Sequence, residues 1–294
     1  LVLLKVQPMQ NSPLVSTDWL ASKLATTVQK NAADSRIITL DASWHMPATG
    51  RSGPAEFIEG LIPGSVFFDI NQIADTSTNL PHTMPSADVF SAKVSALGIK
   101  NTDTLVVYEK GDIPTATRVW WMFRAMGHKK VFVLDGGFRK WQSEGHPTTT
   151  TLTDREQTNY RATFDNSLFR TSDAVQRNID SKTEQLLDAR APGRFSGSEA
   201  EPRPGLRSGH IPGSKNLPIS SLYENGALKN KAELQEIISA LDLDLTTPIT
   251  TTCGSGVTAC NLALAFAVLG KWDVAVYDGS WTEWGSNPKL PIEV

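Results

Sequence analysis

The chain has 294 residues, of which 40% are hydrophobic and 20% charged, and its 28 basic and 31 acidic residues give a net charge of −3. This composition is typical of a globular protein long enough for two domains with one core each. It lacks the basic excess that nucleic-acid binding requires, and no apolar run approaches the ~18 residues of a membrane span. We therefore expect no nucleic-acid partner and no membrane partner.

The cysteines and histidines are few and dispersed. Cys253 and Cys260 are the two cysteines, seven residues apart on what should be one loop and helix. They cannot form a disulfide framework, and this usage suits a reducing compartment, so we expect a cytoplasmic or mitochondrial protein. The five histidines are scattered without metal-ligand spacing, which predicts no metal site.

The first half of the chain alternates predicted helices and strands. Residues 16–18 cap a helix that carries Trp19, Leu20, Leu24 and Val28. A second helix is expected around residues 118–126, where aromatic side chains at helical spacing indicate a core helix. Strands are expected at residues 37–40, 105–108 and 131–134.

The second half repeats the first. Ser172 and Asp173 cap a helix with Val175 and Ile179, and strands are expected at residues 186–187, 249–252 and 274–277. The turn at 60–65 reappears at 209–214. Matching landmarks differ by nearly constant offsets: 188−41=147, 212−63=149 and 278−135=143. Two domains of one fold explain this regularity.

Strands that alternate with helices predict an α/β fold in which each domain is a parallel sheet flanked by helices. We divide the chain into a first domain at residues 10–147, a polar linker at 148–166 and a second domain at 167–294. The interface between two such domains should form a cleft at the carboxyl ends of the strands.

The segment from Cys253 to Ala259 lies between a predicted strand, 249–252, and a predicted helix, 257–269, that is apolar nearly all round. Gly254 and Gly256 allow the loop to turn several N–H groups around the sulfur. These groups and the helix N-terminus favour a thiolate, so Cys253 is a candidate nucleophile. The alternative is a buried structural cysteine in a tight turn.

This Cys-Gly-Ser-Gly-Val-Thr-Ala loop resembles the active-site loop of the sulfurtransferases of the rhodanese superfamily, in the form found in mercaptopyruvate-using members. The resemblance extends over nearly the whole chain and implies tandem rhodanese-like domains. It also implies a persulfide on Cys253, no separate cofactor, and a substrate-binding loop that comprises Gly254, Ser255, Gly256, Val257 and Thr258. In the first domain Glu109 falls at the cysteine's place, and a carboxylate cannot carry sulfane sulfur.

The sulfur donor should depend on the residues that line the loop. In thiosulfate-using members of the superfamily the two positions after the cysteine are typically basic, whereas here they are Gly254 and Ser255. Neutral residues favour 3-mercaptopyruvate. By resemblance, Arg194 and Arg203 match the pair that holds the carboxylate and carbonyl of this donor, a task that suits the planar guanidinium. The alternative is a solvated loop whose charges are balanced by nearby glutamates. Arg190 is expected to be structural.

The resemblance also implies a proton relay from Ser255 to a histidine and an acid of the first domain. His82 matches the histidine. The acid is ambiguous, because Asn71 occupies the matching position and Asp69 lies two residues away on what could be the same strand face. An asparagine can orient an imidazole but cannot stabilise its cation. The alternative for His82 is an ordinary surface residue.

Three other functions compete with this hypothesis. A phosphatase of the Cys-x5-Arg type is nearly excluded, because Ala259 stands where the arginine is required. A thiosulfate sulfurtransferase and a non-enzymatic persulfide carrier stay open. Thioredoxin or small thiols are the plausible acceptors by resemblance, with cyanide as an artificial one.

Overall fold

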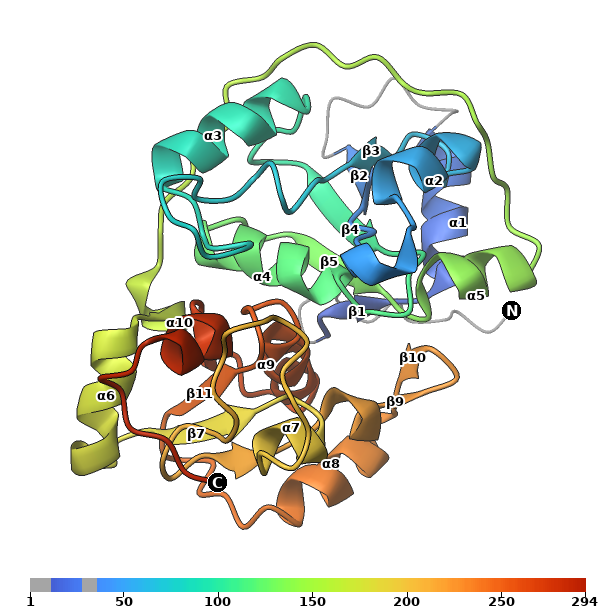
Figure 1. The fold of residues 1–294 in the computed structure, drawn as a ribbon. Helices are drawn as coiled ribbons and strands as arrows, with labels where there is room; N and C mark the ends of the chain where they lie inside the picture. Colours follow the sequence, from blue (N-terminus) through green and yellow to red (C-terminus); the bar gives the residue numbers. More distant parts are fainter. Residues whose placement is uncertain (1–11, 28–35) are drawn as a thin grey trace.

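The computed structural model describes residues 12–27 and 36–294 and consists of two α/β halves stacked on one another (Figure 1). Residues 10 and 11 of the predicted first domain, and Val28 of its first helix, lie outside the described residues.

Each half contains one five-stranded parallel sheet, and the two sheets have the same strand order. The first sheet runs β1 (Leu14–Val15), β5 (Val131–Leu134), β4 (Thr104–Tyr108), β2 (Ile37–Asp41) and β3 (Val66–Phe67). The second runs β6 (Phe169–Arg170), β12 (Ala275–Tyr277), β11 (Ile249–Thr252), β7 (Gln185–Asp188) and β8 (Lys215–Asn216). The predicted α/β repeat is confirmed.

Helices cover both faces of each sheet, and a short antiparallel hairpin joins β9 (Tyr223–Glu224) to β10 (Ala227–Leu228). The first half contains α1 (Thr17–Thr27), α2 (Gly53–Glu59), α3 (Ala87–Ala96), α4 (Ala116–Ala125) and α5 (Gly137–Ser143). The second contains α6 (Ser172–Ser181), α7 (Pro192–Phe195), α8 (Lys231–Ser239), α9 (Ala259–Val268) and α10 (Ser280–Ser286).

The helix caps follow the sequence prediction in one half and depart from it in the other. Ser16 Oγ accepts the N–H of Trp19 at 3.2 Å, as expected for the cap of α1. In the second half the cap is Thr171, whose side chain accepts from Ala174. The predicted cap at Ser172 and Asp173 is therefore wrong by one residue, because Thr171 has the extended backbone of a cap and Ser172 is already helical.

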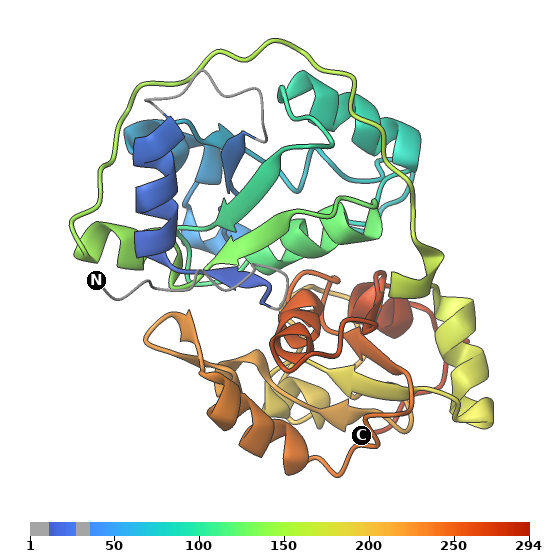
Figure 2. The ribbon, with the colours of Figure 1, turned by 180° about the vertical axis from the view of Figure 1, so that it is seen from behind.

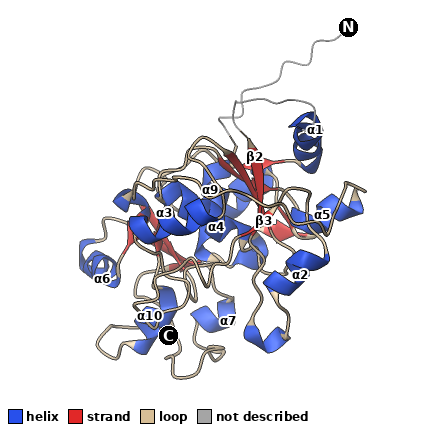
Figure 3. Ribbon diagram, turned by 90° about the horizontal axis from the view of Figure 1, so that it is seen from above, coloured by secondary structure: helices blue, strands red, loops and turns tan. Residues whose placement is uncertain are grey.

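The two halves share a core through α4 and α9, which lie side by side in the middle of the molecule (Figure 3). All but one residue of each helix is buried. Trp120, Trp121 and Phe123 on α4 belong to the same apolar cluster as Leu262 and Phe266 on α9. The prediction that both segments are buried core helices is confirmed, and α9 brings the Cys253 loop against the first half.

The segment predicted as a linker runs along the outer rim of the first half before it reaches α6 (Figure 2). It is extended but attached: Leu61 and Thr149 form an antiparallel bridge, and Tyr160 is buried with its N–H on Ser95 Oγ. The polar composition of this segment does not predict the attachment, because backbone groups and one aromatic ring make most of the contacts.

Candidate active site

Cys253 directly follows β11, at the carboxyl end of a central strand, and its residue is 1% exposed. The segment from Cys253 to Thr258, which we call the Cys253 loop, ends where α9 begins. Strand, loop and buried helix therefore follow one another as the sequence predicted. The arrangement places the sulfur beside a helix N-terminus, where anionic forms are favoured.

The backbone of the Cys253 loop is oriented by the start of α10. The N–H of Trp281 donates to the carbonyl of Cys253 at 2.9 Å, and Thr282 donates to the carbonyl of Gly254 through its N–H at 2.8 Å. The Cys253 N–H donates to Ser280 Oγ at 3.1 Å. By contrast, the N–H groups of residues 254–258 have no hydrogen-bond partner among the described residues. Unpaired donors in one short loop can receive an anion such as a thiolate or persulfide.

Gly256 is the tightest point of the loop. Its φ is +75°, and a Cβ added there would lie 2.5 Å from the carbonyl oxygen of Asp278. Only glycine satisfies both the left-handed backbone and this close approach.

Arg194 and Arg203 both lie near the Cys253 loop. A Cβ on Gly254 would lie 3.1 Å from Arg194 Nη2, so the guanidinium covers the residue after the cysteine. Burial lowers the pKa of Arg203, the Cys253 and Glu201 charges raise it, and the Arg194 charge lowers it. Both arginines therefore come from the segment that precedes the turn at 209–214 and lie near the Cys253 loop.

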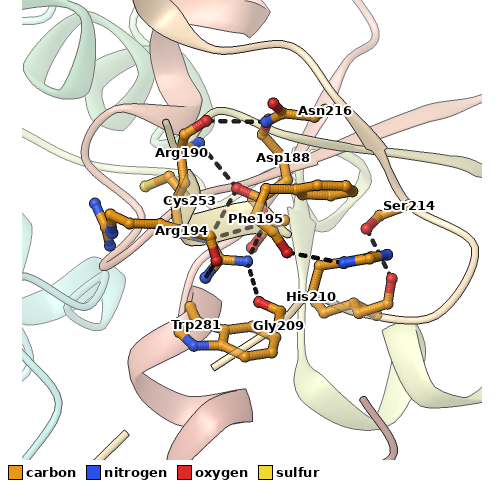
Figure 4. Close-up of polar contacts among 12 residues, drawn as sticks. Asp188, Arg190, Arg194, Phe195, Gly209, His210, Ser214, Asn216, Cys253 and Trp281 are labelled. Carbon is orange, nitrogen blue, oxygen red and sulfur yellow. Dashed lines mark hydrogen bonds and ion pairs between the residues drawn. The ribbon is translucent and has the colours of Figure 1, made fainter. Parts of the chain in front are cut away.

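Glu201 organises this arginine cluster. Its carboxylate accepts from Arg194 Nη2 at 2.5 Å and from Arg190 Nη1 at 2.7 Å, and its side chain is 2% exposed. Arg190 also pairs with Asp188 at 2.6 Å, donates to the Gly209 carbonyl and lies over the Trp281 ring (Figure 4). The prediction that Arg190 is structural is confirmed.

His82 is buried, not a surface residue, and has a φ of +61°. Burial, together with the charges of Arg118 and Arg203, lowers its pKa to about 4, although a backbone hydrogen bond with Ile70 raises it. Its Nδ1 is buried without a partner in the described structure, and its ring meets Trp44 edge-on at 4.9 Å. The imidazole is therefore neutral near pH 7 and poorly suited to take up a proton.

The structure does not bring the predicted acid to His82. The carboxylate of Asp69 accepts the N–H of Asn71 at 2.8 Å, which closes a local turn, and Asn71 is exposed. Ser255 is half-buried, and no hydrogen bond of its hydroxyl is seen among the described residues. A continuous Ser255–His82–Asp69 relay is thus absent from the described geometry.

In the first half, Glu109 occupies the place of Cys253. The N–H of Phe138 donates to its carbonyl at 3.1 Å, as Trp281 does for Cys253. The Glu109 side chain accepts the N–H of Ala116, at the start of α4, at 2.8 Å. Burial raises its pKa to about 7, while the Ala116 hydrogen bond lowers it. The Glu109 carboxyl group thus accepts from a backbone N–H at the start of α4. In the second half, the corresponding N–H groups near α9 are available to a bound anion.

Cys260 is the second residue of α9 and is fully buried. Burial raises the pKa of its thiol to about 12, and its sulfur donates to the carbonyl of Gly256 at 3.3 Å. Its thiol is therefore unreactive at neutral pH, as the sequence indicated.

Sequence reasoning missed Arg118 and Asp278, which form a buried ion pair of 2.5 Å between the two halves. The sequence predicts only that Arg118 belongs to a core helix. A charged residue among the apolar side chains of that helix is the available signal, since a buried arginine requires a partner.

Two negative findings concern the described residues alone. No group of three or more histidine, cysteine, aspartate or glutamate side chains in these ranges is placed to hold a metal ion. None of the helices in the same ranges is long and apolar enough to cross a membrane.

Comparison with known proteins places this geometry in a family. A model of the rhodanese-like domain matches the chain twice, at residues 19–144 and 171–287. Thiosulfate/3-mercaptopyruvate sulfurtransferase 1, mitochondrial, of Arabidopsis thaliana is 41% identical over 96% of this chain and 78% of its own length. Thiosulfate sulfurtransferase of Bos taurus is 45% identical over 92% of this chain and 91% of its own.

A solved structure agrees with the family match and with these two relatives. The crystal structure of SseA from Escherichia coli, described as a 3-mercaptopyruvate sulfotransferase, has a TM-score of 0.81 and 34% identity, and covers 92% of this chain and 99% of its own. With two matched domains, these relatives and the strand-to-helix Cys253 loop, the chain belongs to the rhodanese-like family as a tandem pair of its domains.

Proposed function

We propose that the protein is a sulfurtransferase that moves sulfane sulfur from 3-mercaptopyruvate through a Cys253 persulfide to a thiol acceptor or cyanide. The observation that carries the proposal is the Cys253 loop itself, with unpaired N–H donors at residues 254–258 and the Arg194 guanidinium over Gly254. A nucleophilic sulfur, an anion cradle and a carboxylate-binding cation then lie within one short region.

The reaction proceeds in two steps. The Cys253 thiolate attacks the donor sulfur, an S–S bond forms, the C–S bond breaks, and pyruvate leaves as its enolate and is protonated. The outer sulfur of the persulfide is then taken by an acceptor thiolate or cyanide, which returns the Cys253 thiolate. The loop donors hold the negative charge in both states without a change of geometry.

Each substrate-binding residue has a distinct part in this proposal. Arg194 and Arg203 bind the carboxylate and carbonyl of the donor, and residues 254–258 receive its sulfur. His82 lines the site as a neutral imidazole, consistent with a pKa of about 4. A relay through Asp69 is not part of the proposal, because Asp69 accepts the N–H of Asn71 and has no contact with His82 among the described residues.

Thiosulfate is the second candidate donor, and a specific observation favours it. Arg194 and Arg203 are two cations close to Cys253, and together they also suit a dianion. Relatives at similar identity are named for each donor, so overall identity does not separate them. The neutral Gly254 and Ser255 support mercaptopyruvate.

The two donors are separated by steady-state kinetics with cyanide as the common acceptor. We expect kcat/KM for 3-mercaptopyruvate to exceed that for thiosulfate by about tenfold or more, which corresponds to ~1.4 kcal/mol of transition-state binding. A ratio below one would assign the protein to thiosulfate, and no turnover with either donor would favour a non-enzymatic persulfide carrier.

Removal of either donor-binding arginine should act mainly on KM. Arg194 and Arg203 hold groups present in both donor and transition state, so their loss weakens both equally. Arg194→Ala and Arg203→Ala are each expected to raise KM for mercaptopyruvate about tenfold, because a charged hydrogen bond contributes about 1.5–3 kcal/mol. Arg177→Ala, an exposed change of the same charge on α6, is the control and should leave KM unchanged.

A cysteine persulfide as carrier requires no separate cofactor, and the reaction requires a sulfur donor and an acceptor. We propose thioredoxin or small thiols as physiological acceptors. We also propose a cytoplasmic or mitochondrial location, which is supported by two free cysteines and by a relative named as mitochondrial.

A further inference from the structure

Arg118 is a fully buried side chain that reaches from α4 across the domain interface to the Cys253 loop. Its Nη1 donates to the Asp278 carboxylate at 2.5 Å and to the Gly256 carbonyl at 3.3 Å. Its Nη2 donates to the carbonyl of His82. One side chain of the first half therefore joins the loop to two other segments of the site.

Asp278 holds the same glycine from the other side. Its backbone oxygen lies against the α-carbon of Gly256, and its carboxylate accepts the Met84 N–H at 2.6 Å in addition to Arg118. The Gly256 carbonyl thus accepts from Arg118 and from the Cys260 thiol, and the aspartate backbone packs against the α-carbon of Gly256.

Arg118 is charged although it is buried. Burial lowers its pKa, but Asp278 and Cys260 together raise it by more, so the net shift is upward. A buried ion pair of this kind costs desolvation and is weak evidence for stability, which leaves orientation as the reason for it.

The internal repeat supplies a comparison within the same molecule. α4 and α9 begin at equivalent residues, Ala116 and Ala259, so Asn261 occupies on α9 the place of Arg118 on α4. Asn261 Nδ2 donates to the Pro114 carbonyl in the Glu109 loop at 3.3 Å. Each half therefore contacts the other half's loop from the same helical position. The contact to the loop that contains the cysteine is made by a charged side chain, Arg118, and the contact to the Glu109 loop by a neutral one, Asn261.

We propose that the Arg118–Asp278 pair is a positioning device through which the first domain fixes the Cys253 loop. It acts on the sulfur through Gly256, whose carbonyl direction sets the orientation of the adjoining N–H donors. The inference rests on the proposed function for the reaction, but it holds for either donor, because no donor atom is involved.

The test is a single-turnover measurement of Cys253 persulfidation by mass spectrometry, with mercaptopyruvate and with thiosulfate in turn. The variant Arg118→Met/Asp278→Asn removes both charges and leaves no lone buried ion. Arg118→Lys retains a charge that cannot reach both carbonyl partners at once. Arg124→Met is the matched control, since Arg124 donates from the same helix across the same interface to the Trp272 carbonyl at 2.9 Å.

We expect the double variant to form the persulfide about 100-fold more slowly with whichever donor the wild type uses, because ~1 Å of misplacement costs about that factor. Arg118→Lys should recover part of the loss, and Arg124→Met should match wild type. The donor concentration that gives half the maximal single-turnover rate should change less than about threefold. A folded double variant at wild-type rate would overturn the proposal. So would an equal loss in Arg124→Met, or a loss confined to one of two usable donors. If the wild type formed the persulfide with thiosulfate but not with mercaptopyruvate, the result would instead count against the donor assignment.

Discussion

Replacement of Cys253 by serine is expected to abolish sulfur transfer, with a loss of about 10⁴-fold or more, while the fold stays intact. A hydroxyl cannot carry sulfane sulfur. The fold should survive because the contacts that hold this residue are made by its backbone, to Ser280 and Trp281. The measurement is cyanide-dependent turnover at saturating donor, with circular dichroism to confirm the fold.

Cys260→Ser is the matched control for this loss. Cys260 is buried, with a thiol pKa of about 12, and a serine can keep the hydrogen bond to the Gly256 carbonyl. Its turnover should stay near wild type, and mass spectrometry should find one added sulfur on Cys253 and none on Cys260. Substantial transfer by folded Cys253→Ser would refute the assignment of the nucleophile.

Gly256→Ala should produce the second-largest effect, a fall in kcat of about 100-fold with a clear loss of stability. A Cβ at this position would meet the Asp278 carbonyl oxygen at 2.5 Å, so the loop must move. The left-handed backbone adds about 1–2 kcal/mol of strain. Turnover and thermal unfolding of the purified variant measure the two effects separately.

Gly270→Ala separates backbone strain from displacement of the loop. Gly270 follows α9 with a φ of +97°, and a Cβ there meets nothing within 4 Å. This variant should lose a similar increment of stability to strain and keep its turnover. Equal turnover losses at Gly256 and Gly270 would show that general destabilisation, not the position of the loop, causes the fall.

The sequence predicted the central strands well and the edges poorly. The predicted strands at 249–252 and 131–134 match β11 and β5 residue for residue. These segments are β-branched and buried on both faces, so their composition alone identifies them. The outer strands β1, β3, β6 and β8 are two residues long. This is too short for an alternating hydrophobic pattern to be recognised, and these strands form only because a neighbouring strand is already in place.

In the candidate site, too, some residues could be predicted from the sequence and others could not. The Cys253 loop is local in sequence and could be identified from seven consecutive residues. Arg118 and Asp278 are 160 residues apart and meet only through the packing of α4 on α9. The expected pairing of Asp69 with His82 is not seen among the described residues, where Asp69 instead accepts the N–H of Asn71 in its own local turn.

The burial of α4 and α9 has a consequence for the origin of the chain. A single copy of this domain would leave one such helix uncovered, and a large exposed apolar face favours self-association. The tandem protein is therefore equivalent to a twofold dimer made intramolecular, in which the connecting segment keeps the partner's effective concentration high at any dilution. In a true homodimer both copies must carry the same residue at each position. Once joined, one copy can carry an arginine where the other carries an asparagine, and only one needs to keep its cysteine.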